Sequence, residues 1–94
     1  MEGSIEIILN RYLEPIIPKS DEIKNKIDCV RDIVVFVRDE NYNDYKILSI
    51  INYGTHILLK EHYESPVGEV VIERVLHYIK PSTILKILLP KIFK

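Results

Sequence analysis

The chain has 94 residues, of which 47% are hydrophobic and 29% are charged, and its formal net charge at pH 7 is −1. This composition excludes a disordered chain and is typical of a single domain spanning residues 1–94. Cys29 is the single cysteine, which excludes an internal disulfide framework and favours an intracellular, cytoplasmic location. No apolar run is long enough to span a bilayer, and the first residues lack the pattern of a signal peptide, so we expect neither secretion nor a transmembrane segment. Abundant Ile and Val and the absence of Ala, Gln and Trp suggest an AT-rich genome.

The charges are distributed unevenly along the chain. Residues 74–94 contain five basic residues and no acidic residue, whereas residues 1–73 are net acidic. Residues 82–94 are also the most apolar stretch of the sequence, and we call them the basic C-terminal segment. An apolar and basic end on an acidic body predicts a contact surface.

The first part of the chain predicts two helices. One helix is expected over residues 4–13, because Pro15 and Pro18 forbid its continuation. A second helix is expected over residues 20–38, because apolar residues recur there at alternating spacings of four and three. These apolar residues are Ile23, Ile27, Val30, Val34 and Val37. The last turns, residues 33–37, are almost wholly apolar, so this end is either buried on more than one side or extended as a strand.

The second part of the chain predicts further short helices. Residues 45–53 can place their apolar side chains on one helix face, and residues 55–63 can form another short helix. Residues 66–80 fit a helix better than a strand, because a strand would place Glu69 and Glu73 on the same face as several valines. The basic C-terminal segment is expected to form a last helix that Pro90 interrupts.

These elements predict a mainly α fold, a compact bundle of about five short helices. The alternative is an α+β fold, in which two or three helices pack on a small sheet with strands near residues 45–53 and 67–75. Local propensity leaves this alternative open, because the many β-branched residues favour strands.

Candidate catalytic and metal-binding residues are few. His56 and His62 are the candidates for metal ligands, but their spacing of six does not align two imidazoles on a helix as a spacing of four does. Cys29 has no histidine near it in the sequence to activate its thiol. We therefore expect no catalytic residue, no metal, no cofactor and no enzyme activity.

A nucleic-acid-binding protein is one alternative function. The helices expected over residues 55–63 and 66–80 have the approximate spacing of a helix-turn-helix. Arg74 and Lys80 are the residues expected to contact nucleic acid in that case, whereas Glu69 and Glu73 would repel phosphates.

A second alternative comes from a resemblance that covers residues 12–72. The resemblance is carried by Tyr12-Leu13-Glu14-Pro15, Asp32-Ile33-Val34, Gly54-Thr55 and the segment from Ser65 to Ile72. In this order the motifs resemble the opening of the nucleotidyltransferase fold of oligoadenylate synthetases and cyclic GMP-AMP synthases. That family has two metal-binding Asp residues where this chain has Pro66 and Gly68, or in another register Val67 and Glu69. The resemblance therefore implies a degenerate and catalytically inactive relative.

The interpretation we favour is a small non-enzymatic protein that acts by protein–protein association. We expect self-association into a homo-oligomer through the basic C-terminal segment, whose broad apolar arc suits a groove on a partner protein. Peripheral contact with an acidic membrane is an alternative for the same arc, which can also simply complete the core. The expected interaction residues are Ile84, Leu85, Lys86, Leu88, Lys91, Ile92, Phe93 and Lys94.

Overall fold

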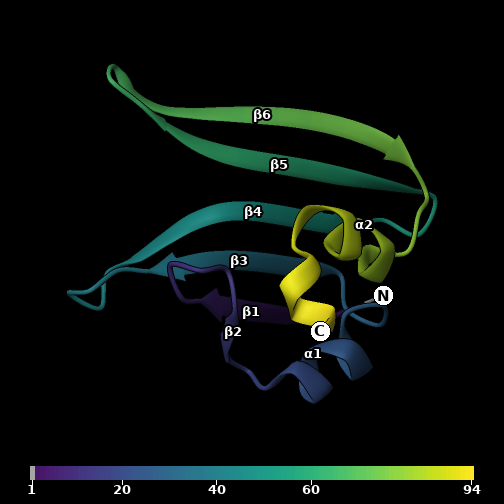
Figure 1. The fold of residues 1–94 in the computed structure, drawn as a ribbon. Helices are drawn as coiled ribbons and strands as arrows, with labels where there is room; N and C mark the ends of the chain where they lie inside the picture. Colours follow the sequence, from purple (N-terminus) through teal and green to yellow (C-terminus); the bar gives the residue numbers. More distant parts are fainter. Residues whose placement is uncertain (1) are drawn as a thin grey trace.

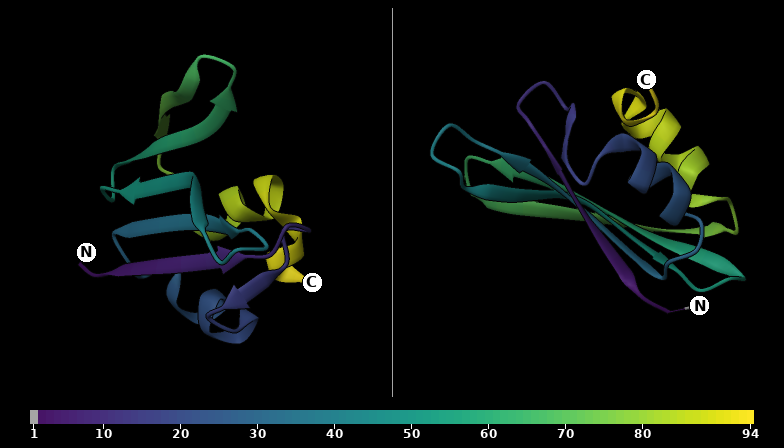
Figure 2. Two further views of the ribbon diagram at one scale, coloured as in Figure 1. Left: turned by 90° about the vertical axis from the view of Figure 1, so that its left-hand side faces the viewer. Right: turned by 90° about the horizontal axis from the view of Figure 1, so that it is seen from below.

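The chain folds as a twisted β-sheet with helices on one of its faces (Figures 1 and 2). The computed structural model describes residues 2–94. Its elements are β1 (Ser4–Leu9), β2 (Pro15–Ile17), α1 (Ser20–Lys26), β3 (Asp32–Arg38), β4 (Asp44–Asn52), β5 (His56–Ser65), β6 (Gly68–His77), α2 (Pro81–Leu88) and the 3-10 helix η1 (Pro90–Phe93). Within residues 2–94 the fold is mainly β, so the predicted bundle of about five helices is wrong. No helix in this part of the chain is long and apolar enough to cross a membrane.

The six strands lie in the order β2-β1-β3-β4-β5-β6. β1 and β3 are parallel neighbours connected through β2 and α1, and all other neighbouring strands are antiparallel. One edge of the sheet is β2, which has three residues, and the other edge is β6, which has ten. The turn between β5 and β6 lies far from both helices in Figure 1. The helices therefore cover only part of the sheet and leave most of β6 exposed.

The hydrophobic core lies between the sheet and the helices. In β1, Ile5, Ile7 and Leu9 are buried while Ser4 and Glu6 are exposed, because successive side chains of a strand point to opposite faces. The core is completed by Ile33, Val35, Leu48, Ile50, Ile57 and Leu59 from the other strands and by Ile23, Ile27, Ile84, Leu85, Leu89 and Ile92 from the helical segments. Both ends of the chain thus contribute to one core.

The helices predicted over residues 4–13 and 20–38 are wrong over most of their length. Residues 4–9 form β1, α1 takes only Ser20–Lys26, and Asp32–Arg38 forms β3. Residues 33–37 are β-branched except for Phe36, and such side chains pack better on a pleated strand than on a helix. Their burial alternates with a period of two at the start of β3, so strand propensity prevailed over the helical spacing.

The helices predicted over residues 45–53, 55–63 and 66–80 are also wrong, because these ranges contain most of β4, most of β5 and all of β6. The α+β alternative placed strands near 45–53 and 67–75, where the structure has β4 and β6, but in a smaller sheet. Glu69 and Glu73 do share one face of β6 with valines, which was the reason for expecting a helix there. This arrangement is tolerated because β6 is an edge strand with both faces exposed to water.

The basic C-terminal segment forms α2 and η1. α2 begins at Pro81, and Pro90 begins η1. The Ser82 amide donates a hydrogen bond to Asp28 Oδ1 at 2.9 Å, and the Ser82 hydroxyl donates to Asp28 Oδ2 at 2.8 Å. Asp28, which follows α1, therefore caps the start of α2 and connects the two helical segments.

Candidate functional site

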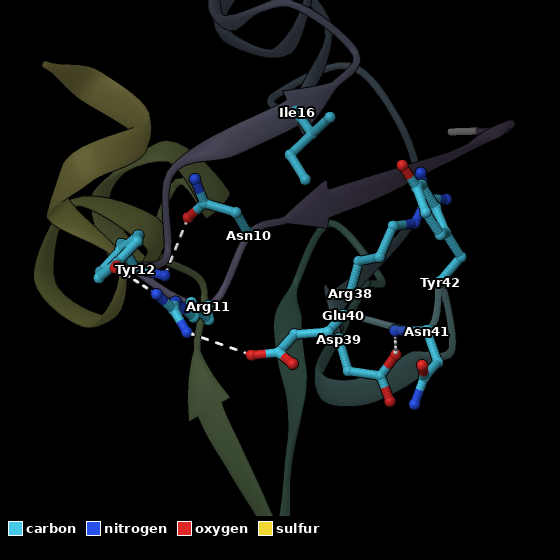
Figure 3. Close-up of a pocket in the computed structure, with 9 residues that line it drawn as sticks. All are labelled: Asn10, Arg11, Tyr12, Ile16, Arg38, Asp39, Glu40, Asn41 and Tyr42. Atoms are coloured by element: carbon cyan, nitrogen blue, oxygen red, sulfur yellow. Dashed lines mark hydrogen bonds and ion pairs between the residues drawn. The ribbon is translucent and has the colours of Figure 1, made fainter.

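A cleft of about 610 Å³ lies between the β1–β2 loop and the β3–β4 loop (Figure 3). The two loops meet because β1 and β3 are parallel neighbours, so their carboxyl ends lie at the same end of the sheet. The cleft is lined by Asn10, Arg11, Tyr12, Ile16, Arg38, Asp39, Glu40, Asn41 and Tyr42. The carboxyl ends of parallel strands are a common position for ligand sites. Whether the polar side chains of this cleft are free to bind a ligand depends on the hydrogen bonds that they already form within the protein.

Asp39 holds the β3–β4 loop in shape. Its Oδ1 accepts hydrogen bonds from the backbone amides of Asn41 at 2.8 Å and Asn43 at 2.9 Å, and its Oδ2 accepts one from the Tyr45 hydroxyl at 3.1 Å. These hydrogen bonds, above all the one from the Asn43 backbone, lower the pKa of Asp39 below its ordinary 3.8. The hydrogen bond to Asp39 raises the pKa of Tyr45. The Asp39 carboxylate is thus engaged by its own loop.

The arginines of the cleft are also engaged by the protein. Arg38 Nε donates to Asp44 Oδ1 at 2.8 Å, and this hydrogen bond raises the pKa of Arg38 and lowers that of Asp44. Arg11 forms an ion pair with Glu40 at 3.3 Å across the two loops and donates to the Tyr12 hydroxyl at 2.7 Å (Figure 3). These ion pairs and hydrogen bonds therefore account for the cleft as the contact region between the two loops.

The two histidines considered as metal ligands lie far apart. His56 and His62 are six residues apart on one face of β5, which corresponds to about 20 Å along an extended strand. The His56 ring stacks on Tyr53 with a distance of 4.8 Å between the ring centroids. The structure therefore does not bring the two imidazoles to one ion.

His62 lies where β5 separates from β4. The pairing of these strands ends at Leu48 and Glu61, one residue before His62. The His62 side chain is only 12% exposed, and neither ring nitrogen has a hydrogen-bond partner among the described residues. Glu69 Oε1 lies 3.4 Å from Nδ1. Sequence analysis missed this pair, because only the register of the β5–β6 hairpin places Glu69 beside His62.

The interaction residues expected in the basic C-terminal segment divide into buried and accessible side chains. Ile84, Leu85 and Ile92 are buried in the core. Lys86, Leu88, Lys91 and Lys94 are exposed, and Phe93 is half-buried. Lys91 Nζ donates to the Tyr12 carbonyl at 2.8 Å, and Lys86 Nζ lies 5.3 Å from the centre of the Phe93 ring. Most of the apolar arc of this segment therefore faces the core.

The residues expected to contact nucleic acid lie outside any helix. Arg74 is on β6 and donates to the Glu61 carboxylate, while Lys80 is exposed just before α2. Glu61 also accepts a hydrogen bond from the Tyr63 hydroxyl, and this bond, followed by the contacts with Arg74, lowers the pKa of Glu61. β5 and β6 replace both helices of the expected helix-turn-helix, so that prediction is wrong.

The motifs of the nucleotidyltransferase resemblance are also separated. Gly54 and Thr55 lie in the turn before β5, whereas Pro66 and Val67 lie in the turn after it. Because β5 has 10 residues, the two turns are about 30 Å apart. The structure does not combine these positions into one site.

The most exposed apolar surface of a strand lies on β6, and sequence analysis missed it. β6 pairs with β5 on one side, and its other side is the edge of the sheet. Val70, Val71, Ile72 and Val75 are 43%, 41%, 46% and 71% exposed. Apolar side chains therefore protrude from both faces, next to an outer row of backbone N–H and C=O groups that no other strand within residues 2–94 pairs with. We call residues 68–77 the β6 edge.

No protein-family model, no curated protein and no solved structure matches this chain.

Proposed function

We propose that the protein acts by association with proteins rather than by catalysis, and that a partner strand extends its sheet at the β6 edge. The observation that carries this proposal is the exposure of Val70, Val71, Ile72 and Val75 along a ten-residue edge strand. A long, apolar edge strand offers backbone hydrogen bonds and side-chain contacts to an added strand.

The two edges of the sheet differ in a way that supports this proposal. β2 is only three residues long and begins with Pro15, whose nitrogen cannot donate to a neighbouring strand. Short edge strands and prolines are common means of preventing edge-to-edge pairing. The β6 edge has neither protection, so strand addition is favoured at this end of the sheet.

We propose a cytoplasmic location for this activity. Cys29 is an exposed free thiol, which supports a reducing compartment.

Binding of strand-forming peptides tests the proposed function. One labelled peptide copies residues 68–77, and a second alternates Val with Lys so that its lysines can face Glu69 and Glu73. We expect both peptides to bind more tightly than scrambled versions and to slow hydrogen exchange of the β6 amides. Binding no better than that of the scrambled peptides, or protection confined to other strands, would contradict the proposal.

A further inference from the structure

We infer that the partner at the β6 edge is a second copy of this chain, paired antiparallel through its own β6 with the twofold axis at Ile72. This inference rests on the proposed function. It follows from the exposure of the β6 edge together with the order of charged and apolar residues along it. The geometry of symmetric strand pairing limits the registers that these residues can adopt.

Two copies of one edge strand pair antiparallel when a twofold axis runs perpendicular to the sheet. This axis keeps the helices of both copies on the same side of the continuous sheet. Residues directly opposite each other then belong to the same face, and successive side chains of a strand alternate between faces. One residue of β6 must therefore lie opposite itself at the axis, and each choice of this residue defines one register.

Like charges exclude the registers on either side of Ile72. An axis at Glu73 places the two Glu73 carboxylates opposite each other, and an axis at Arg74 does the same for the two guanidinium groups. An axis at Val71 places Glu69 of each copy opposite Glu73 of the other. Like charges directly opposite each other destabilise a strand pair. Axes nearer the ends of β6 pair much less of the strand.

The axis at Ile72 avoids each of these conflicts. Ile72 then faces Ile72, Val70 faces Arg74, Val71 faces Glu73, and Glu69 faces Val75, with continuous pairing from Gly68 to Leu76. The exposed aliphatic side chains of each copy gain a neighbour on the other copy. A cross-strand apolar pair at the centre, with charges set beside aliphatic residues, is the arrangement that this sequence favours.

Light scattering and sedimentation over a range of concentrations give the first test. We expect the wild-type protein to dimerise and Ile72→Lys to weaken the dimer by about tenfold or more, because two ammonium groups would then meet at the axis. Val67→Lys is the matched control, since Val67 is 95% exposed in the turn outside the paired region. Circular dichroism and thermal melting establish that both variants are folded.

Cysteine cross-linking gives the register. In a Cys29→Ser background, Ile72→Cys is expected to form an intermolecular disulfide under mild oxidation faster than Val71→Cys or Glu73→Cys, because only opposite residues approach within disulfide distance. Fastest cross-linking at residue 71 or 73, or a dimer unaffected by Ile72→Lys, would overturn the inference. A protein that stays monomeric at all concentrations would also overturn it, whereas binding of the Val-Lys peptide to that monomer would leave the proposed function standing.

Discussion

Asp28 should contribute more to stability than its place in a short loop suggests. It accepts hydrogen bonds from the Ser82 amide and hydroxyl at 2.9 and 2.8 Å, and both bonds end on a carboxylate at the start of α2. Bonds to a charged group contribute about 1.5–3 kcal/mol each when buried, and helix caps contribute about 0.5–2 kcal/mol. Because this site is only partly buried, we expect Asp28→Ala to lower the free energy of unfolding by about 2 kcal/mol. Asp28→Asn, which keeps one acceptor, should lose about 1 kcal/mol.

Urea and thermal unfolding at one fixed protein concentration measure these changes. For a domain of this size, a loss of about 2 kcal/mol corresponds to a decrease in Tm of about 8–16 °C. Glu6→Ala controls for the loss of one exposed negative charge. A double-mutant cycle with Ser82→Ala should give a coupling energy of about 1 kcal/mol. A change below about 0.5 kcal/mol for Asp28→Ala, or strictly additive single mutants, would refute the capping argument.

Three further predictions concern the C-terminal segment, His62 and the acidic loop. Deletion of residues 82–94 should abolish the cooperative thermal transition in circular dichroism. Each buried aliphatic side chain that is removed contributes about 1.5–3 kcal/mol, and the free energy of unfolding of a domain of this size is small. A truncated chain that still melts cooperatively would argue against this. His62→Leu should preserve or raise the free energy of unfolding, by up to about 1 kcal/mol, because it removes two buried nitrogens without partners; clear destabilisation in urea would show that the contact with Glu69 matters more. Asp39 has a lowered pKa in the folded protein, so its contribution to stability is complete above its unfolded pKa of about 4 and is lost as the pH falls through the lower folded value. Thermal melting at pH values from 7 to 2 should therefore show a smaller decrease in Tm for Asp39→Asn than for wild type. Equal decreases in Tm for the two proteins would contradict this prediction.

The fold was only partly predictable from the sequence. Among the expected elements, the helix of residues 82–94 and its interruption at Pro90 lie closest to the structure, because prolines constrain the backbone locally. For residues 33–37 and 67–75 the sequence favours a helix and leaves a strand as the alternative, and the structure has strands at both. Their apolar spacing fits both periods, while their β-branched residues favour strands. For β6 the ordinary alternation of polar and apolar residues fails, since only its last residues, near Leu76, pack against the core.

The candidate sites were less predictable, because they depend on neighbours distant in the sequence. The bonds between Asp28 and Ser82 join residues that are 54 positions apart in the chain, and no local motif indicates them. The exposure of β6 follows from its final position in the strand order, which the local sequence does not specify. The sequence shows the apolar arc of the basic C-terminal segment. That most of this arc packs against the sheet depends on the tertiary structure, which the local sequence does not specify.

The strand order also bears on how the chain acquires its structure during synthesis. β3 to β6 pair as successive hairpins, so each strand can join its neighbour soon after it leaves the ribosome. α2 and η1, which cover the inner face of the sheet together with α1, follow all six strands along the chain. We therefore expect a nascent sheet that exposes its apolar inner face until α2 and η1 have left the ribosome, and a chain that depends on rapid packing of these helices to avoid aggregation.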